Sequence, residues 1–280
     1  MIKFMNQNIK RIYPHNKDTK CKLDNLYLNP LLSDIYKNSR PVYYANFLSS
    51  LDGRIAVYSK KHRLLLTPDA IKSSVDFTLF SQLHAQADCL VTNTNYMKGL
   101  NKGYYGDILS VKNKKLAQWR KDNDIRSHKI IILSNSLDFP INKKLESYKD
   151  KIVILTTATN LKKINKFKEK GYEIVKCQGN NVSAKSLNKY IIKNKFKSVY
   201  FIAGPTIVEK MIAEKLLDRL YYSTSMSLIG TQKYDTIIRG KFLKETVNLN
   251  LIEMFIYTKV IRDITTQTSF QVFNIKKGKK

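Results

Sequence analysis

Residues 42–56 read VYYANFLSSLDGRIA, and this stretch decides the fold. Its first part, 42–48, is rich in apolar and aromatic residues and predicts a β-strand. The polar run 49–54 that follows predicts a loop, and residues 55–57 return to extended character. A strand that ends in small and polar residues marks the edge at which an open α/β sheet binds ligands.

Downstream of this stretch, predicted strands alternate with predicted helices. The next helix begins at Thr67, because Ile71, Val75, Leu79 and Leu83 recur every four residues behind a proline near the first turn. The further predicted strands are 89–92, 129–133, 152–155, 173–175, 198–202 and 220–223, and the further predicted helices are 114–121, 160–169, 184–193 and 205–216. Such alternation predicts an α/β fold with a mostly parallel central sheet and helices on both faces. The last two strands, 253–259 and 269–275, are predicted to form an antiparallel edge or a hairpin.

The chain has the material for one large domain, since it holds 280 residues of which 43% are hydrophobic. Residues 1–39 are polar and rich in lysine, and we interpret them as an N-terminal extension packed on the core. No Pro/Gly-rich linker and no internal repeat interrupts residues 40–275. We therefore predict a single domain there, followed by the basic tail 276–280.

The formal net charge of +28 is the most unusual bulk property. Clustered Lys and Arg side chains attract nucleic-acid backbones, but here the lysines are spread along almost the whole chain. This distribution indicates a solvated basic surface that favours phosphorylated ligands rather than a specific nucleic-acid site. A basic nucleic-acid-binding protein stays as an alternative class.

The cysteines and the apolar runs bear on location. Cys21, Cys89 and Cys177 are widely spaced and form no CxxC pair, which favours a reducing compartment and no structural metal. Neither a signal peptide nor a run of roughly 20 apolar residues is found, so we expect a cytoplasmic protein without a membrane partner.

Three loops follow predicted strands and are candidates for a ligand site: 49–54, 92–96 and 203–206. In the third, small residues let the backbone approach a ligand. The helix that starts at Pro205 would present free N–H groups and the positive end of its dipole to a phosphate. Walker, GxGxxG, HExxH, GxSxG and zinc-deaminase motifs are absent from the sequence, so the chemistries that depend on them have no support.

Taken in order, these segments resemble the pyrimidine reductases of riboflavin biosynthesis, a family with a dihydrofolate-reductase-like fold. The resemblance is carried by Arg40-Pro41, SLDGRIA at 50–56, ADCLVTNT at 87–94, AGPTI at 203–207, LLDRL at 216–220 and SLIG at 227–230. It implies that NADPH reduces the ribosyl group of a 5-phosphoribosylamino-pyrimidine to ribityl, and that the protein is a homodimer. The deaminase domain of the bifunctional members has no counterpart in this chain.

The resemblance also implies roles for individual residues. The cofactor would be bound by Leu48, Thr94, Tyr96, Ala203, Gly204, Pro205, Thr206 and Ile207. Asn46, Asp52 and Asp107 would take part in the reaction, with Asp107 as proton donor, and Arg54, His62 and Arg63 would meet the substrate. Asp52 has a second interpretation as the residue that shapes its turn, and Asp107 has one as a residue that caps or shapes its loop.

Several positions depart from the family pattern. Ile202 stands in the place of a substrate-binding glutamate, Ala203 replaces the first glycine of a pair, and residues 58–64 lack the usual Gly-Glu-Ser and tryptophan. The part around Asp107 matches only after an insertion that contains Lys102, Gly103 and Tyr104. Two alternatives therefore stay open: a reductase of this fold with another pterin- or pyrimidine-like substrate, and an NADPH-binding homologue without catalysis.

Overall fold

The computed structural model describes residues 8–15, 19–37, 39–106, 109–141, 143–202, 204–240, 243–261 and 263–276. The strands in chain order are β1 (Asn8–Tyr13), β2 (Val42–Ser50), β3 (Ala56–Ser59), β4 (Leu64–Leu66), β5 (Cys89–Asn93), β6 (Lys129–Ser134), β7 (Ile152–Thr156), β8 (Glu173–Lys176), β9 (Ser198–Phe201), β10 (Arg219–Ser225), β11 (Tyr234–Asp235), β12 (Leu249–Ile261) and β13 (Ile264–Ile275). The α-helices are α1 (Ser74–Gln86), α2 (Thr94–Asn101), α3 (Lys114–Asp122), α4 (Lys143–Glu146), α5 (Leu161–Glu169), α6 (Ala184–Lys193) and α7 (Pro205–Ala213). Short 3₁₀ helices span Leu23–Asn25, Leu32–Asp34, Asp69–Ile71 and Lys149–Lys151.

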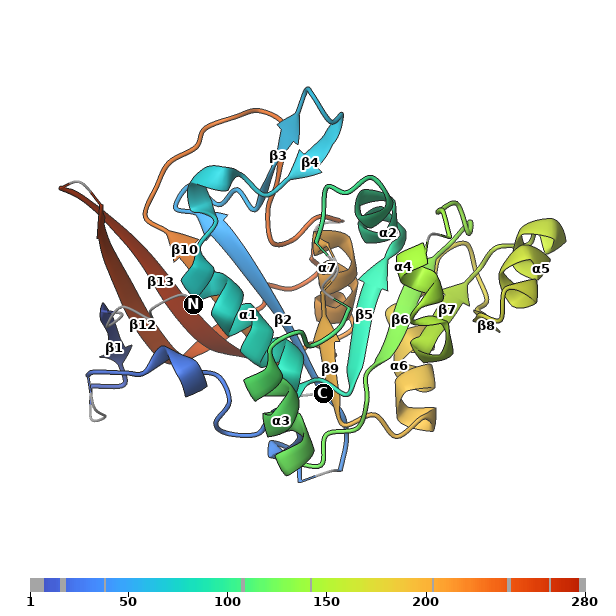
Figure 1. Ribbon diagram of the computed structural model, residues 1–280, viewed down its shortest axis with the longest axis horizontal. Helices are drawn as coiled ribbons and strands as arrows, with labels where there is room; N and C mark the ends of the chain where they lie inside the picture. The colour runs from blue at the N-terminus through green and yellow to red at the C-terminus, as the bar shows by residue number, and fades with distance from the viewer. Residues whose placement is uncertain are drawn as a thin grey trace.

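The described strands form one large sheet in the order β1-β12-β13-β10-β2-β9-β5-β6-β7-β8 (Figure 1). Every neighbouring pair from β10 to β8 is parallel, whereas β13, β12 and β1 are joined antiparallel. The predicted α/β fold, with a mostly parallel sheet and antiparallel C-terminal strands, is therefore confirmed. A second, three-stranded sheet of β11, β3 and β4 lies above the carboxyl ends of β2 and β10 (Figure 1).

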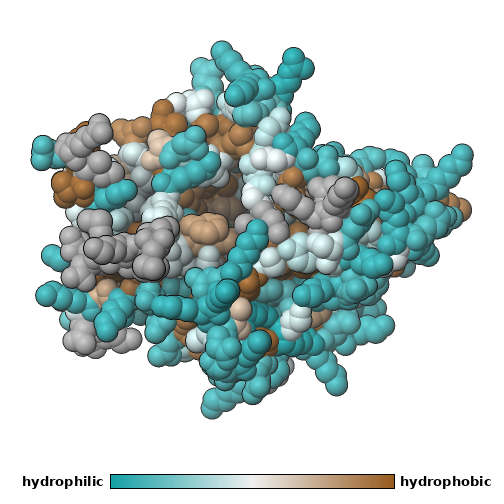
Figure 2. Space-filling view, viewed as in Figure 1, coloured by the Kyte–Doolittle hydropathy of each residue, from teal (hydrophilic) through white to brown (hydrophobic). Residues whose placement is uncertain are grey.

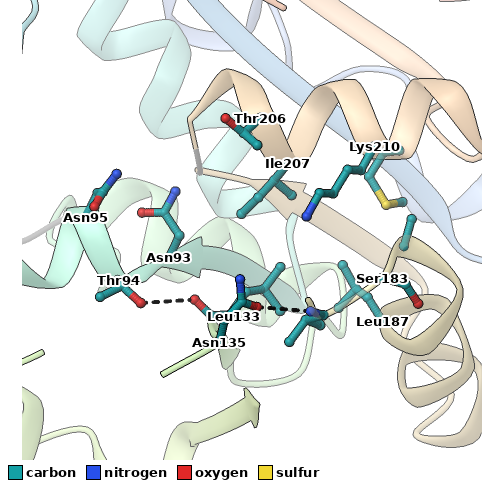
Figure 3. Close-up of a pocket in the computed structure, with 13 residues that line it drawn as sticks. Asn93, Thr94, Asn95, Leu133, Asn135, Ser183, Leu187, Thr206, Ile207 and Lys210 are labelled. Carbon is teal, nitrogen blue, oxygen red and sulfur yellow. Dashed lines mark hydrogen bonds between the residues drawn. The ribbon is translucent and has the colours of Figure 1, made fainter. Parts of the chain in front are cut away.

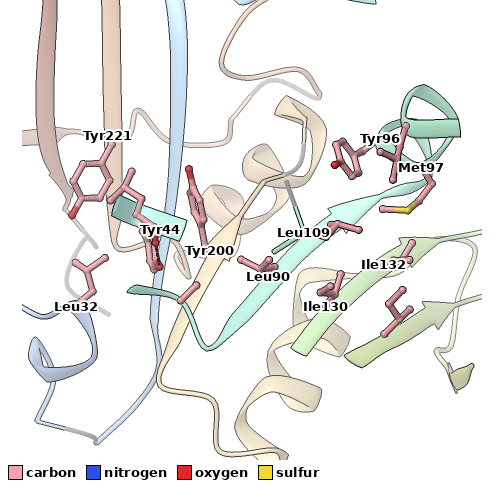
Figure 4. Close-up of a cluster of buried hydrophobic side chains, with 14 of the residues drawn as sticks. Leu32, Tyr44, Leu90, Tyr96, Met97, Leu109, Ile130, Ile132, Tyr200 and Tyr221 are labelled. Atoms are coloured by element: carbon pink, nitrogen blue, oxygen red, sulfur yellow. Dashed lines mark hydrogen bonds between the residues drawn. The ribbon is translucent and has the colours of Figure 1, made fainter. Parts of the chain in front are cut away.

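Hydrophobic side chains cover both faces of the large sheet, as a parallel sheet requires. Alternate residues of β2 point to opposite faces: Tyr44 packs with α1 and Tyr200, and Tyr43 packs with residues of α6 and α7. Figure 4 shows the first of these two clusters, in which Tyr44, Tyr200 and Leu90 are 0% exposed. Helices on both faces are thus confirmed as well.

The described part of the N-terminal extension packs on the first cluster and contributes β1, which pairs with β12. Two buried glutamines of α1 hold it in place. The Leu23 carbonyl oxygen accepts a hydrogen bond from Gln82 Nε2 at 2.6 Å, and the Leu32 N–H donates to Gln86 Oε1 at 2.7 Å. These bonds satisfy backbone groups that have no strand partner.

A buried ion pair joins the start of β2 to the start of β10. The Asp218 carboxylate accepts hydrogen bonds from Arg40 Nη1 (3.1 Å) and Nη2 (2.9 Å), from the Tyr36 hydroxyl (3.0 Å) and from the Tyr43 N–H (2.9 Å). Its side chain is 1% exposed, against 38% for Arg40. The two distant segments 40–41 and 216–220 are therefore parts of one structural unit.

Several predicted boundaries were wrong: β12 and β13 are longer than predicted, α7 ends at Ala213 instead of residue 216, and two errors concern helix starts. The helix predicted from Thr67 begins only at Ser74, where the Ser73 hydroxyl accepts from the Val75 N–H at 3.2 Å, and a 3₁₀ turn precedes it. The predicted loop 92–96 contains the start of α2, because Asn93 Oδ1 accepts from the Tyr96 N–H at 3.1 Å. Ser73, which was predicted to lie inside a helix, and Asn93, which was predicted to lie in a loop, are N-caps in the structure.

Candidate active site

A cavity of about 580 Å³ lies at the carboxyl ends of β2, β9 and β5, beneath the three-stranded sheet. Asn46 and Leu48 line it from β2, Tyr96 from α2, and Phe80 from α1. Figure 2 shows a hollow near the centre of this face, with hydrophobic residues inside and hydrophilic residues around it. The position is the one at which parallel α/β sheets bind ligands.

The charged residues that line the cavity are mostly cationic. Arg63, Lys98, Lys102 and Arg239 all line it, and Asp235 is the one acid among the lining residues that the structure describes. Asp235 Oδ1 accepts from Arg239 Nη1 at 2.8 Å, so its charge is already neutralised. The excess of positive charge favours an anionic ligand.

A second, narrower pocket of about 240 Å³ lies beside the cavity (Figure 3). First-turn and N-cap residues of three helices line it: Asn93 and Thr94 of α2, Ser183 of α6, and Thr206 of α7. Helix N-termini present N–H groups and partial positive charge, which favours anions. Lys210 points into this pocket from α7 and is the one cation among its described lining residues (Figure 3).

The cavity and the pocket adjoin one another. Asn93, Asn95 and Thr206 line both. A Cβ atom built on Gly204 would lie 3.8 Å from Asn93 Nδ2, so any larger side chain at position 204 would project toward this junction. The combined site is elongated, with a wide end that is partly apolar and a narrow end that suits phosphates.

Most of the predicted site residues come together here. Asn46, Leu48, Arg63, Tyr96, Gly204, Pro205 and Thr206 line the cavity, while Thr94 and Ile207 line the pocket. Asn46 Oδ1 accepts a hydrogen bond from the Tyr200 hydroxyl, and Tyr96 donates its hydroxyl proton to the Gly106 carbonyl at 2.8 Å. Their roles toward a ligand stay predictions. Asp107 and Ala203 lie outside the described residues.

Asp52 and Arg54 are engaged with one another instead of lining the cavity. Asp52 Oδ2 accepts from the backbone N–H groups of Ile229 (3.1 Å) and Gly230 (2.9 Å), and lies 2.9 Å from Arg54 Nη1. The hydrogen bond from Ser50 to Asp52 is the largest factor that lowers the pKa of this carboxyl, and the two amides lower it further. This geometry favours the alternative interpretation, in which Asp52 shapes the turn.

His62 is not among the lining residues either. Its ring packs against Tyr104 at 4.5 Å between centroids, in the turn between β3 and β4. Arg63, its neighbour, does line the cavity and has a positive φ of 53°. The predicted substrate residues of this turn are therefore separated, one at the cavity and one on its outer side.

One carboxyl group near the cavity was missed. Asp76 is half-buried in the first turn of α1, one turn before the cavity-lining Phe80. Burial raises its pKa to about 6, and a hydrogen bond with Ser223 limits the rise. Ser223 lies next to Leu48 in the parallel register of β10 and β2. Acidic residues are common in the first turn of a helix, so the sequence around Asp76 does not indicate that this residue lies near a ligand site.

The predicted site residues also did not include Lys210, Asn93 or Tyr105. Lys210 is the one lysine of α7, but its sequence context does not indicate that its side chain faces a pocket. Asn93 was visible as part of loop 92–96. Ile202, which stands where the family glutamate was expected, lines the cavity and donates its N–H to the Val91 carbonyl at 3.0 Å.

Fold and site together define a ligand-binding α/β domain whose elongated site, at the carboxyl ends of parallel strands, suits a phosphate-bearing ligand. Residues 41–261 match the family model of the RibD C-terminal domain. The chain belongs to this family, and the predicted family is confirmed.

Solved structures show the same fold. A pyrimidine reductase-like protein from Corynebacterium diphtheriae superposes with a TM-score of 0.67 at 17% identity, covering 92% of this chain and 100% of that one. RibD from Acinetobacter baumannii gives 0.59 at 15% identity over 85% of this chain, which spans 58% of that protein's length. The riboflavin biosynthesis reductase Rib7 from Saccharomyces cerevisiae gives 0.55 at 14% identity, covering 85% of this chain and 90% of that one.

Membership in the RibD C-terminal domain family indicates an oxidoreductase. Among the described residues, no helix has the length and apolar composition needed to cross a membrane.

Proposed function

We propose that this chain is an NADPH-dependent reductase that converts the ribosyl group of a 5-phosphoribosylamino-pyrimidine to ribityl in riboflavin biosynthesis. The observation that supports this most is that the two parts of the site adjoin and share Asn93, Asn95 and Thr206. A nicotinamide dinucleotide is elongated and carries phosphates in its middle, and the helix N-termini of the narrow pocket suit those phosphates. The wide cavity then remains for the reacting ring and the second substrate.

NADPH fits the residues present. The backbone at Gly204 and the first turn of α7 would meet the pyrophosphate, and a side chain at position 204 would intrude on the junction. Lys210 would receive the 2′-phosphate, since it is the cation that points into the narrow pocket. When bound, NADPH supplies the hydride.

The chain's own residues would bind and orient the reactants, which is most of what hydride transfer requires. Leu48 and Ile202 form an apolar surface on the side of β2 and β9. Asn46 is held in place by its hydrogen bond with Tyr200 and offers an amide group to the substrate. The cations Lys98 and Lys102 suit the substrate phosphate.

Ile202 supports a second candidate, a reductase of the same fold with another pterin- or pyrimidine-like substrate. An aliphatic side chain cannot accept hydrogen bonds from a substrate, so the ring-recognition contact that a glutamate would make is missing at this position. A homodimer and a cytoplasmic location remain part of the proposal.

The test is a titration of the purified protein with NADPH and NADH, followed by nicotinamide fluorescence, and then an assay of turnover with the phosphoribosylaminopyrimidine. We expect NADPH to bind more tightly than NADH. The variant Lys210→Ala should lose at least about tenfold in NADPH affinity and much less in NADH affinity. Lys166→Ala, which removes an exposed lysine of α5 that lines neither part of the site, is the matched control. Equal affinities of the wild-type protein for the two nucleotides would contradict the proposal, and NADPH turnover with a different pyrimidine or pterin only would favour the second candidate.

A further inference from the structure

The five residues 102–106 form a strap, the name used here for this segment, which leaves the end of α2 and reaches the three-stranded sheet. Lys102 ends the helix, and Gly103 turns the chain with a φ of 72°. The Tyr105 hydroxyl then donates to the carbonyl of Leu65 in β4 at 3.2 Å. The strap therefore links two elements that line the cavity from different sides.

The Tyr105 ring packs directly against the backbone of α2 at Gly99. A Cβ atom built on Gly99 would lie 2.1 Å from Cδ2 and from Cε2 of Tyr105, a distance that no side chain could tolerate. Glycine inside a helix is less favourable than alanine. Gly99 thus lowers the intrinsic stability of α2, and the space it leaves is occupied by this ring.

The ring also forms part of the cavity wall. Tyr105, Tyr96 and Gly99 all line the cavity, and the two tyrosine rings are nearly parallel, with 12° between their planes and 5.8 Å between their centroids. Burial and the nearby Asp235 raise the pKa of Tyr105, so its hydroxyl stays protonated and able to donate to Leu65. This part of the cavity wall is therefore flat and aromatic. The Tyr105 ring is held in place by its packing on the backbone at Gly99 and by the hydrogen bond of its hydroxyl group.

We propose that Tyr105 is a specificity-determining residue, whose ring, held on Gly99 by the strap, stacks against the flat heteroaromatic ring of the substrate. This inference rests on the proposed function and deepens it, because it names the contact that recognises the ring where Ile202 offers no hydrogen bond. Stacking of a base on an aromatic side chain is typically worth about 1–3 kcal/mol, which corresponds to roughly 5- to 150-fold in affinity.

The test compares the wild-type protein with Tyr105→Ala, Tyr105→Phe, Gly99→Ala and the double variant Gly99→Ala/Tyr105→Ala. Asn101→Ala, an exposed position of the same helix outside the cavity, controls for helix propensity. The dissociation constant of 5-amino-6-(5-phosphoribosylamino)uracil is measured by calorimetry, anaerobically and without cofactor, and NADPH affinity is measured separately by fluorescence. Thermal unfolding checks that each variant is folded.

We expect Tyr105→Ala and Gly99→Ala each to weaken pyrimidine binding by at least about tenfold, within the range for stacking. Tyr105→Phe and Asn101→Ala should bind like the wild-type protein, and NADPH affinity should not change in any of these variants. Gly99→Ala should have no further effect once Tyr105 is alanine, because its only effect is to displace the ring.

Wild-type pyrimidine affinity in folded Tyr105→Ala, or a wild-type protein that does not bind the pyrimidine at all, overturns the inference. An additive effect of the two substitutions overturns the role of Gly99 as the seat of the ring. Failure of the wild-type protein to bind NADPH is a separate result, which overturns the proposed function and not the stacking contact.

Discussion

Replacing Asp218 by alanine is expected to destabilise the protein strongly, although Asp218 lines neither part of the site. The substitution removes an acceptor with 1% exposure that receives four hydrogen bonds from three residues, Arg40, Tyr36 and Tyr43. The loss of the Tyr43 partner matters most, because a buried N–H left without an acceptor costs about 1–3 kcal/mol. Arg40 and Tyr36 can turn to water, since Arg40 is 38% exposed, so their loss adds about 1 kcal/mol.

The expected total is therefore about 3 kcal/mol, at the lower end of the 3–5 kcal/mol typical for breaking a buried ion pair. In a chain of this size such a loss lowers the midpoint of thermal unfolding by roughly 6 °C or more. Urea unfolding followed by circular dichroism at neutral pH would measure it. Asp69→Ala, which removes an ion pair whose aspartate is 95% exposed, is the control and should leave stability unchanged. If Asp218→Ala loses no more stability than this control, the reasoning about the buried amide and the buried carboxylate is refuted.

Four further outcomes are expected. Gly204→Asp should abolish NADPH binding in a folded protein, because it adds a side chain and a negative charge at the junction of cavity and pocket; normal NADPH binding in the fluorescence titration would place the phosphates elsewhere. Burial raises the pKa of Asp76 to about 6 in the folded protein, so the free energy of unfolding of the wild type should fall as pH rises from about 4 to 6. Asp76→Asn lacks this titration. Its free energy of unfolding, measured in urea, should therefore rise relative to wild type by on the order of 2 kcal/mol as pH goes from about 4 to 7. For His128 the pH dependence has the opposite sign, because burial, His84 and Arg120 hold its pKa well below the usual value. The free energy of unfolding should fall as pH drops below about 6.5, and in His128→Gln it should fall less steeply in the same assay. Asp107→Asn should leave NADPH affinity intact and slow turnover at least about a hundredfold if this residue is the proton donor, and unchanged turnover would favour solvent or another group.

The strands of this fold could be predicted well because their apolar runs are continuous. The predicted strands 129–133 and 152–155 each lie within one residue of β6 and β7, whose side chains are buried on both faces. The helix starts of α3, α5, α6 and α7 were also predicted to within one residue, but those of α1 and α2 were missed. Ser73 and Asn93 are polar residues that serve equally in turns and as N-caps, and only the neighbouring N–H groups decide between these roles.

The candidate site could be predicted as far as chain order reveals it. Loops that follow parallel strands meet at one sheet edge, so Asn46, Tyr96 and Thr206 were found together. Asp52 accepts hydrogen bonds from the amides of Ile229 and Gly230, which lie 177 and 178 residues further along the chain. No local sequence pattern predicts such contacts. The packing of the Tyr105 ring on Gly99 could not be predicted either, because a single glycine in a helical sequence does not indicate which side chain packs against it.

The order of strands also constrains how the chain can acquire this structure during synthesis. β1 bonds to the sheet through β12, β12 bonds to the rest through β13, and β13 bonds to β10. The first described strand to leave the ribosome can bond locally to residues 19–21, but it has no partner strand of the large sheet until residues 249–275 have followed it, and that pairing spans nearly the whole chain. Contacts so distant in sequence form late and slowly. The parallel strands, whose partners are all made earlier, can assemble first, and until β13 is inserted the edge of β10 stays open to the wrong partner.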